Sequence, residues 1–117
     1  DNDKILRAIN HIKTLILPND IVLKEQQFLS YMPADRLIKT DKQNKILVQG
    51  VADLIIIKND EIYLIDYKTS RIKDVKLFKE KYATQLDIYA KAIESFYEKP
   101  VTKKMIYSFY LDELVII

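Results

Sequence analysis

Two strongly apolar stretches occupy the middle of this 117-residue chain, and the turn between them restricts the folds it can adopt. They cover residues 46–57 (ILVQGVADLIII) and 61–69 (EIYLIDYKT), and Asn59-Asp60 lies between them. Runs rich in Val and Ile on either side of such a turn are typical of adjacent β-strands. A strand that is apolar on both faces belongs at the centre of a sheet. We therefore predict a central β-hairpin.

The flanking sequence predicts helices and further strands on both sides of this hairpin. Apolar residues recur at helical spacing in two segments, and Asp74 is a candidate N-cap for the second. The expected helices span residues 3–17 and 74–97, and the further strands span 21–31, 103–111 and 114–117. The polar stretch 33–45 is expected to form a loop. The order α-β-β-β-α-β, with a short strand after it, predicts an α/β fold with a mixed sheet, in one domain over residues 1–117.

Three charged residues interrupt the apolar hairpin: Asp53 on its first strand, and Asp66 and Lys68 on its second. A tight antiparallel hairpin centred on Asn59-Asp60 pairs residues symmetrically about that turn, so Asp53 should lie directly opposite Asp66. Their Cβ atoms would then be ~5 Å apart. Lys68 follows Asp66 by two positions, and such side chains point to the same face of a strand. We predict that all three side chains meet on one face of the sheet.

Two facing carboxylates need a counter charge, because like charges directly opposite each other destabilise a sheet and are costly to bury unpaired. One solution is a divalent cation, since Mg²⁺ commonly takes one or two carboxylates together with water and substrate phosphate. The other solution is a structural ion pair, in which Lys68 neutralises Asp53 and Asp66. The residue types favour the metal site and leave the ion pair as the alternative.

Composition removes several classes of site. The chain has no cysteine, which excludes disulfides, zinc–thiolate sites and iron–sulfur clusters and suits a reducing cytoplasm, so we expect a cytoplasmic protein. A single glycine excludes a glycine-rich phosphate loop. No apolar run reaches the ~18 residues that span a membrane. The net charge of +2 says little about nucleic acid, but six basic and only two acidic residues fall within residues 68–81.

Four short motifs follow one another along the chain. Asp66-Tyr67-Lys68 has the form (D/E)-x-K, and Asp53 precedes it in Gly50-Val51-Ala52-Asp53-Leu54. Gln85-Leu86-Asp87-Ile88-Tyr89 has the form Q-x-x-x-Y, and Lys24-Glu25-Gln26-Gln27-Phe28 is close to E-x-P-F. In this order and spacing the motifs resemble the PD-(D/E)XK nuclease superfamily, over about residues 21–110. More narrowly, they look like the RecB-type nuclease domain at the C-terminus of AddA helicase–nuclease subunits.

The resemblance implies a restriction-endonuclease-like core and a metal-dependent nuclease. It implies that Asp53, Asp66 and the backbone carbonyl of Tyr67 bind Mg²⁺ or Mn²⁺. It also implies that Lys68 orients or deprotonates the attacking water or stabilises the transition state, with Glu25 as a further catalytic residue. The residues expected to bind DNA or support the site are Gln85, Tyr89, Tyr82, Arg71 and Lys73.

The same resemblance implies the setting of the domain. The substrate would be DNA, cut as an exonuclease during double-strand break repair and recombination. A helicase domain would lie in the same polypeptide, and an AddB-like second subunit would be the partner. Because AddB belongs to an iron–sulfur branch of the family, the absence of cysteine favours AddA over AddB. A self-standing exonuclease or a CRISPR-associated relative is a further possibility.

Two departures from the family pattern affect the expected activity. Ala52 and Gln27 stand where the family motifs have proline. The family also carries a metal-binding histidine in a G-x-x-x-H setting, whereas His11 has no preceding glycine and flanks an apolar helical stripe. We expect His11 to be a helix-surface or half-buried residue and the family's histidine helix to precede this C-terminal fragment. The alternative function is a non-catalytic nuclease-like module that docks DNA or a partner.

Overall fold

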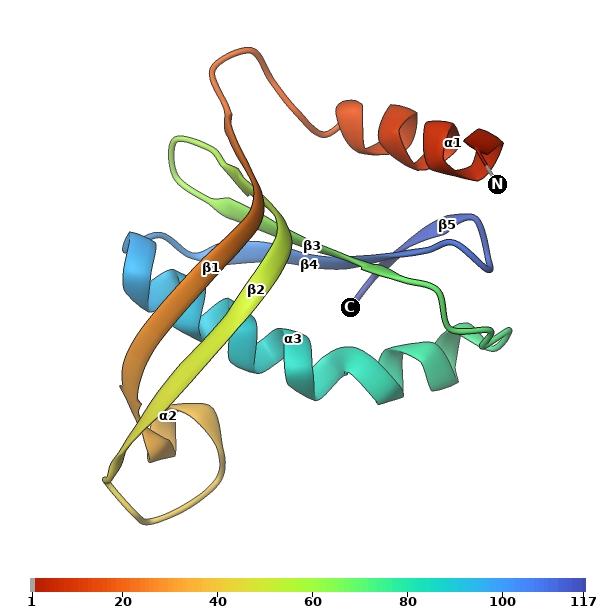
Figure 1. Ribbon diagram of the computed structural model, residues 1–117. Helices are drawn as coiled ribbons and strands as arrows, with labels where there is room; N and C mark the ends of the chain where they lie inside the picture. The colour runs from red at the N-terminus through yellow and green to blue at the C-terminus, as the bar shows by residue number, and fades with distance from the viewer. Residues whose placement is uncertain (1) are drawn as a thin grey trace.

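The computed structural model describes residues 2–117, which form three helices and five strands (Figure 1). In chain order these are α1 (Asn2–Lys13), β1 (Ile21–Pro33), α2 (Ala34–Leu37), β2 (Lys45–Ile57), β3 (Ile62–Lys68), α3 (Val75–Tyr97), β4 (Val101–Ser108) and β5 (Glu113–Ile116). The predicted order of elements is confirmed, with α2 added inside the stretch expected to be a loop. Within residues 2–117, none of the helices combines the length and the apolar character needed to cross a membrane.

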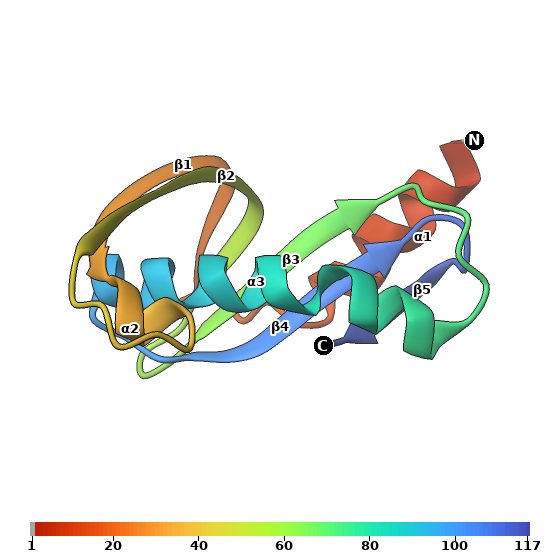
Figure 2. The same cartoon turned by 90° about the horizontal axis from the view of Figure 1, so that it is seen from below.

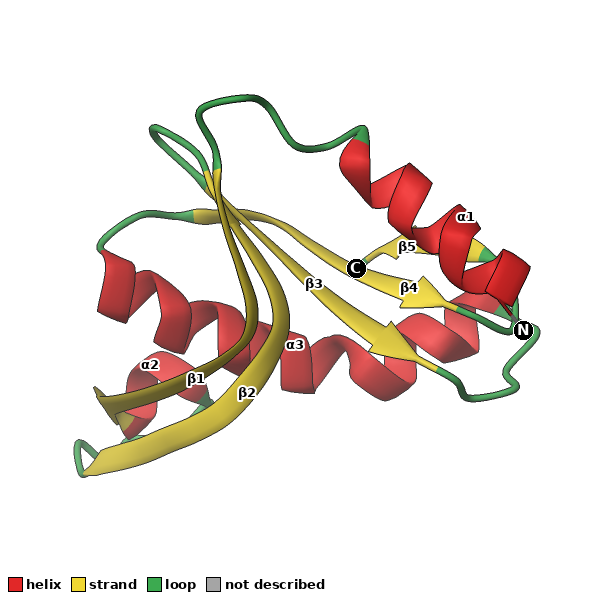
Figure 3. Cartoon of the chain, turned by 45° about the horizontal axis from the view of Figure 1, so that its top comes forward, coloured by secondary structure: helices red, strands yellow, loops and turns green. Residues whose placement is uncertain are grey.

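The five strands form one mixed sheet in the order β1-β2-β3-β4-β5. Neighbouring strands are antiparallel except β3 and β4, which run parallel because α3 connects them as a crossover. Helix α3 covers one face of the sheet, and α1 lies on the other (Figures 1 and 3). Each face has its own core, with Phe78 and Ile93 of α3 packed on one side and Ile12 of α1 on the other. The predicted α/β fold with a mixed sheet is confirmed.

The central hairpin has the predicted register. Leu54 pairs with Ile65, and Ile57 pairs with Ile62, so the pairs are symmetric about Asn59-Asp60. The Lys58 N–H donates to the Glu61 carbonyl at 2.8 Å and closes the turn. The turn residues and the two-residue period of the strands are therefore enough to align these two strands.

Strands β1 and β2 continue beyond the rest of the sheet as a bent two-stranded arm. β3 pairs with β2 only from Leu54 to Ile57, whereas β1 pairs with β2 from Lys45 onward. Figure 2 shows this arm arching past the C-terminal half of α3. The prediction that residues 46–57 are central throughout is wrong for the arm, where Leu47 and Val51 are 42% and 48% exposed. Only one face of the arm rests on α3, so its apolar residues are not buried on both sides.

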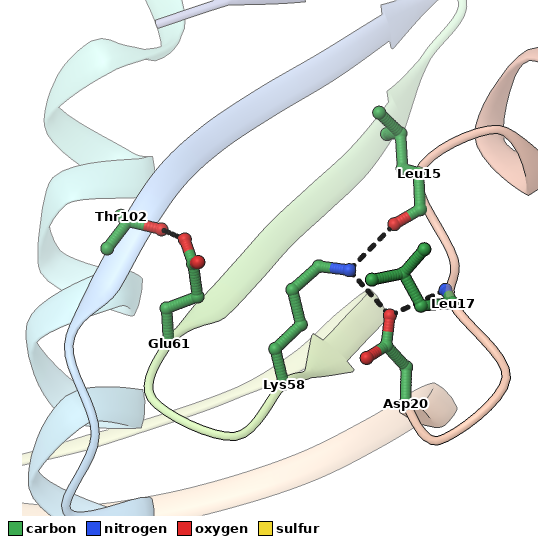
Figure 4. Close-up of polar contacts among 6 residues, drawn as sticks. All are labelled: Leu15, Leu17, Asp20, Lys58, Glu61 and Thr102. Atoms are coloured by element: carbon green, nitrogen blue, oxygen red, sulfur yellow. Dashed lines mark hydrogen bonds and ion pairs between the residues drawn. The ribbon is translucent and has the colours of Figure 1, made fainter.

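The connection from α1 to β1 is fixed to the hairpin turn by Lys58 (Figure 4). The Lys58 ammonium donates to the Leu15 carbonyl at 2.9 Å and pairs with Asp20 at 2.5 Å. Asp20 also accepts the Leu17 N–H at 2.8 Å, and both charged side chains are nearly buried. The chain leaves the helix at Lys13 to reach this contact, so the predicted helix over 3–17 is too long at its C-terminal end.

The strand predicted over 103–111 ends earlier than expected. β4 stops at Ser108, whose hydroxyl oxygen accepts the Leu111 N–H at 3.0 Å. The chain then turns through Asp112, which has a left-handed φ of 55°, into β5. A local side-chain hydrogen bond of this kind competes with the strand ladder and ends it.

Helix α3 begins where the sequence predicts. The Asp74 carboxylate accepts the Lys76 N–H at 2.8 Å and the Leu77 N–H at 3.4 Å, which is the bonding pattern of an N-cap. At the other end Glu98 adopts a left-handed conformation and closes the helix. The cap fixes where the helix starts and therefore which of its side chains face the end of β3.

Candidate functional site

The candidate site lies where β2 separates from β3. The ladder between these strands ends at the pair Leu54–Ile65, and the next position on β2 is Asp53. The Asp53 Oδ2 accepts the Tyr67 N–H at 2.9 Å, so a side chain replaces the backbone carbonyl that a continuing strand would supply. Asp53 is thereby held at the open end of the hairpin, beside the final residues of β3.

The two carboxyl groups meet at this point, as the register predicts. Burial is the main cause that raises the pKa of Asp66 to about 6, and a hydrogen bond with Asp53 raises it further. Lys68 acts in the opposite direction on this pKa, because its ammonium lies 3.0 Å from Asp66 Oδ2. The side chains of Lys68 and Asp66 are 25% and 21% exposed, so the group is accessible from solvent but largely desolvated. The predicted meeting of Asp53, Asp66 and Lys68 on one face is observed.

A switch of faces along β2 produces this geometry. Val48 and Ala52 before Asp53, and Ile55 and Ile57 after it, all pack into the core on the α3 side. Strict alternation along a strand would put these two pairs on opposite faces. The inward positions therefore change from even to odd residue numbers as the strand passes Asp53, and the strand twists sharply there.

Strand β1 makes the same switch at Glu25. Phe28 and Met32 pack on the α3 side, and so does Leu23. Glu25 has a φ of 48°, a left-handed conformation that is uncommon for residues other than glycine. It lies opposite Asp53 in the register, between the pairs Lys24–Leu54 and Gln26–Ala52. Uncommon backbone conformations of this kind collect at functional sites, where surrounding structure holds them in place.

The predicted role of Glu25 receives limited support from the geometry. Its backbone is adjacent to Asp53, but its side chain is exposed. Within residues 2–117, no group of three acidic or histidine side chains gathers closely enough to hold a metal ion. The structure thus brings Glu25 to the site as a backbone bend and does not bring its carboxylate to Asp53 and Asp66.

The oxygen atoms at the site suit a hard divalent cation. Within a strand, the N–H and C=O of one residue lie on the same edge, so the Tyr67 carbonyl is on the edge that faces Asp53. Asp53, Asp66 and this carbonyl form an all-oxygen donor set, the kind that Mg²⁺ and Mn²⁺ prefer. Burial and the neighbouring Asp53 outweigh Lys68 in their effect on the pKa of Asp66, so the site favours an additional positive charge. The residues present fit such an ion.

Helix α3 contributes Tyr82 to the site. The Lys68 ammonium lies 4.9 Å from the centre of the Tyr82 ring, and the Tyr82 and Ser70 hydroxyl oxygens are 2.6 Å apart. Tyr82 also contacts the buried ring of Phe78 edge-on at 5.1 Å. None of the sequence motifs assigns a role to Ser70. Its position two residues after Lys68, on the same face of an extended segment, is the signal that could have found it.

The other residues predicted on α3 lie farther from the acids. Tyr89 packs edge-on against Phe28 at 4.9 Å and sits over Gly50, so it holds the arm to α3. Helical spacing predicts that Gln85 shares a face with Tyr82 and Tyr89 and needs a partner there. It is instead exposed, because the neighbouring Leu86 takes the buried position.

Basic residues surround the entrance to the site. Arg71 and Lys73 are exposed in the segment that joins the end of β3 to α3. Three further exposed lysines follow on the first turns of α3: Lys76, Lys79 and Lys81.

His11 lies away from this group, exposed on α1 at the opposite face of the sheet. Its ring contacts Tyr107 edge-on at 6.3 Å. The expectation that His11 is a helix-surface residue agrees with this placement.

A mixed sheet with an acid pair and a lysine at the open end of its central hairpin defines a class, the restriction-endonuclease-like α/β domains. The sequence profile described as "PD-(D/E)XK nuclease superfamily" matches residues 5–114. The chain belongs to this superfamily.

Proteins similar to this chain share one name, which describes each as the AddA-type subunit of an ATP-dependent helicase/nuclease. The chain is 36% identical over 106 residues to that of Listeria monocytogenes serotype 4b (strain F2365), covering 83% of this chain and 9% of the relative. It is 37% identical over 101 residues to that of Ligilactobacillus salivarius (strain UCC118), covering 84% and 8%. It is 32% identical over 118 residues to that of Clostridium kluyveri (strain ATCC 8527), covering 96% and 10%. The chain spans about a tenth of the length of these relatives.

Proposed function

We propose that this chain is the metal-dependent nuclease domain of an AddA-type helicase–nuclease and that it hydrolyses phosphodiester bonds in DNA. The observation that carries the proposal is the pair Asp53–Asp66 with Lys68 beside it, at a solvent-accessible end of the sheet. A module that only docks DNA has no need of two facing acids whose mutual contact destabilises the fold. The match of the chain to the nuclease superfamily supports the same conclusion.

The residues of the site divide the chemistry among them. Asp53, Asp66 and the Tyr67 carbonyl would hold Mg²⁺ or Mn²⁺, and a bound ion lowers the pKa of water and neutralises charge on the scissile phosphate. Lys68 is placed to orient the attacking water or to stabilise negative charge on the phosphate in the transition state. Glu25 acts at most through its backbone bend or through water. Arg71 and Lys73 would contact phosphates of the DNA backbone without reading sequence.

The wider setting follows from the relatives. Their printed name joins a helicase and a nuclease in one protein, and the chain matches about a tenth of their length. We propose that a helicase domain in the same polypeptide delivers DNA strands to this site, and that an AddB-like second protein is the partner. The activity would be that of a cytoplasmic exonuclease in double-strand break repair and recombination.

A cleavage assay tests the proposed activity directly. Full-length protein and the 117-residue chain are incubated with labelled DNA and Mg²⁺ or Mn²⁺, each as wild type, Lys68→Ala and Lys91→Ala. We expect Lys68→Ala to abolish cleavage by the full-length protein, while Lys91→Ala, which removes a surface ion pair with Asp87, leaves it unchanged. Equal cleavage by wild type and Lys68→Ala would remove Lys68 from the mechanism.

Ion binding separates the nuclease from the docking module. We expect Mg²⁺ or Mn²⁺ to raise the melting temperature of the wild-type domain, because an ion that binds only the folded state stabilises it. Asp66→Ala should abolish the rise, and Asp87→Ala, at an exposed carboxylate on α3, should preserve it. Absence of any response to the ions in the wild type, with full stability of Asp53→Leu, would favour a non-catalytic docking module.

A further inference from the structure

We propose that Tyr82 is a positioning residue that holds the ammonium group of Lys68 in place, and that Ser70 fixes the Tyr82 ring for this purpose. The inference rests on the proposed nuclease function, because it concerns the orientation of Lys68 in that reaction. It assigns Tyr82 a defined contact and gives Ser70 a role that the motifs of the family do not indicate.

Lys68 is held at two points. Its ammonium lies 3.0 Å from Asp66 Oδ2 and 4.9 Å from the centre of the Tyr82 ring. A lysine side chain is a point charge on a flexible four-carbon stem, so one carboxylate contact leaves it free to swing. A cation over the face of a tyrosine ring is attracted by the ring's negative face, and the attraction grows when the pair is desolvated. The ring therefore supplies the second point that defines where the ammonium sits.

The ring is itself immobilised from both ends. At its base, it meets the fully buried Phe78 ring edge-on at 5.1 Å. At its tip, its hydroxyl oxygen lies 2.6 Å from the hydroxyl oxygen of Ser70. Ser70 follows Lys68 by two residues, so this hydrogen bond ties α3 to the end of the strand that carries the lysine. The strand and the helix thereby share one rigid contact around the Lys68 side chain.

Core packing alone does not account for Tyr82. The residue is only partly buried, and one face of its ring is turned toward the lysine ammonium rather than toward apolar side chains. A residue that only fills the core beside Phe78 would need no hydroxyl partner. The exposed Lys81 also lies near this ring, at 5.5 Å, but the ion pair with Asp66 is made by Lys68.

The kinetic test compares variants of the full-length protein in single-turnover DNA cleavage with Mg²⁺. We expect Tyr82→Leu to lower the cleavage rate roughly 5- to 30-fold at saturating DNA, with little change in the DNA concentration that gives half the maximal rate. Tyr82→Phe keeps the ring and should retain most of the rate. Ser70→Ala should match Tyr82→Phe, and combining these two changes should add nothing further.

The control is Tyr31→Leu, the same change at a tyrosine that is 68% exposed on the arm, and it should cleave like the wild type. Wild-type rates for Tyr82→Leu would overturn the role of the ring. Ser70→Ala behaving like the wild type while Tyr82→Phe is impaired would overturn the role of Ser70.

A spectroscopic test is independent of activity and of the folding of Tyr82→Leu. The ring current of Tyr82 should shift the ε-methylene protons of Lys68 upfield in the NMR spectrum of the wild-type chain, and Tyr82→Phe should preserve this shift. An unshifted Lys68 resonance in the wild type would overturn the proposal even if the leucine variant does not fold. If Lys68→Ala cleaves normally, the proposed function fails, whereas the ring-current shift still reports whether Tyr82 holds Lys68.

Discussion

Asp53 uses one carboxylate for two contacts. Its Oδ2 accepts the Tyr67 N–H at 2.9 Å, and the same side chain is hydrogen-bonded to Asp66. The first contact satisfies a backbone donor that would otherwise lose its partner where β2 leaves β3. The second brings two acids together in a partly desolvated place, where they are costly without a cation. An asparagine could make the first contact, but only an acid also leaves a negative charge for a metal ion.

Neutralising one acid should therefore stabilise the chain when no divalent ion is bound. We expect Asp66→Asn to raise the free energy of unfolding by ~1–2 kcal/mol at about pH 8 in a chelating buffer, a value reduced for solvent screening of this partly exposed group. Chemical denaturation of both proteins measures the difference. The exposed Asp87→Asn is the control and should not stabilise. A destabilised Asp66→Asn would show that the acids are not in conflict.

The pH dependence of the wild type follows from the same residue. The pKa of Asp66 is raised from 3.8 to about 6 in the folded chain, so the folded state binds this proton more tightly than the unfolded state does. The resulting stabilisation is complete below the unfolded pKa and is lost as the pH rises through about 6. Denaturation curves in chelating buffer should show this loss in the wild type and a flatter profile in Asp66→Asn.

Among the elements, the arm of β1 and β2 sets the shape of the site. It leaves the sheet at Glu25 and Asp53, where both strands change the face they turn toward α3. The arm is then held by Tyr89, whose ring approaches the backbone of β2 so closely that only glycine fits at residue 50. This contact lies three residues before Asp53 in sequence and keeps the arm at a constant distance from α3.

Adding one methyl group should disturb this contact. A Cβ at residue 50 would lie 2.7 Å from the Tyr89 hydroxyl oxygen and 2.9 Å from Phe28 Cζ. We expect Gly50→Ala to lower the free energy of unfolding by ~1–3 kcal/mol through overpacking, measured by chemical denaturation. Combining it with Tyr89→Leu should cost less than the two single changes together, because the larger side chain that causes the clash is gone. Strict additivity would place the cause elsewhere.

For the molecule as a whole, the chemistry is concentrated at one end of the sheet. The acid pair, the end of β3 and the start of α3 lie together there, and Arg71 and Lys73 are exposed between them. The other end is closed by the Lys58–Asp20 pair and the hairpin turn (Figure 4). A strand of nucleic acid that reaches the acids would therefore pass exposed positive charge.

Removing that charge should weaken DNA binding without changing sequence preference. We expect the double variant Arg71→Gln/Lys73→Gln to lose affinity on all DNA sequences and to show a shallower dependence of binding on salt between about 50 and 200 mM. Fluorescence anisotropy with several duplexes and single strands measures both quantities. The matched control is Lys39→Gln/Lys42→Gln in the segment that joins α2 to β2. If only one DNA sequence is affected, these residues read bases instead.

How far the sequence predicts this protein depends on the range of the interactions involved. The hairpin register, the meeting of Asp53, Asp66 and Lys68, and the N-cap at Asp74 were all predictable. Each depends on a turn, on the two-residue period of a strand or on a hydrogen bond within one helical turn. These are local properties of the chain, and its own residues are sufficient to determine them.

Tertiary structure decided the features that depend on distant packing. The bend at Glu25, the exposure of Gln85 and the contact of Tyr82 with Lys68 all arise because α3 lies across one face of the sheet. The apolar pattern of residues 46–57 predicts a central strand throughout, yet β3 ends its pairing at Leu54 and leaves the rest to the arm. Which neighbour each stretch meets is a long-range property, and no local pattern in the chain specifies it.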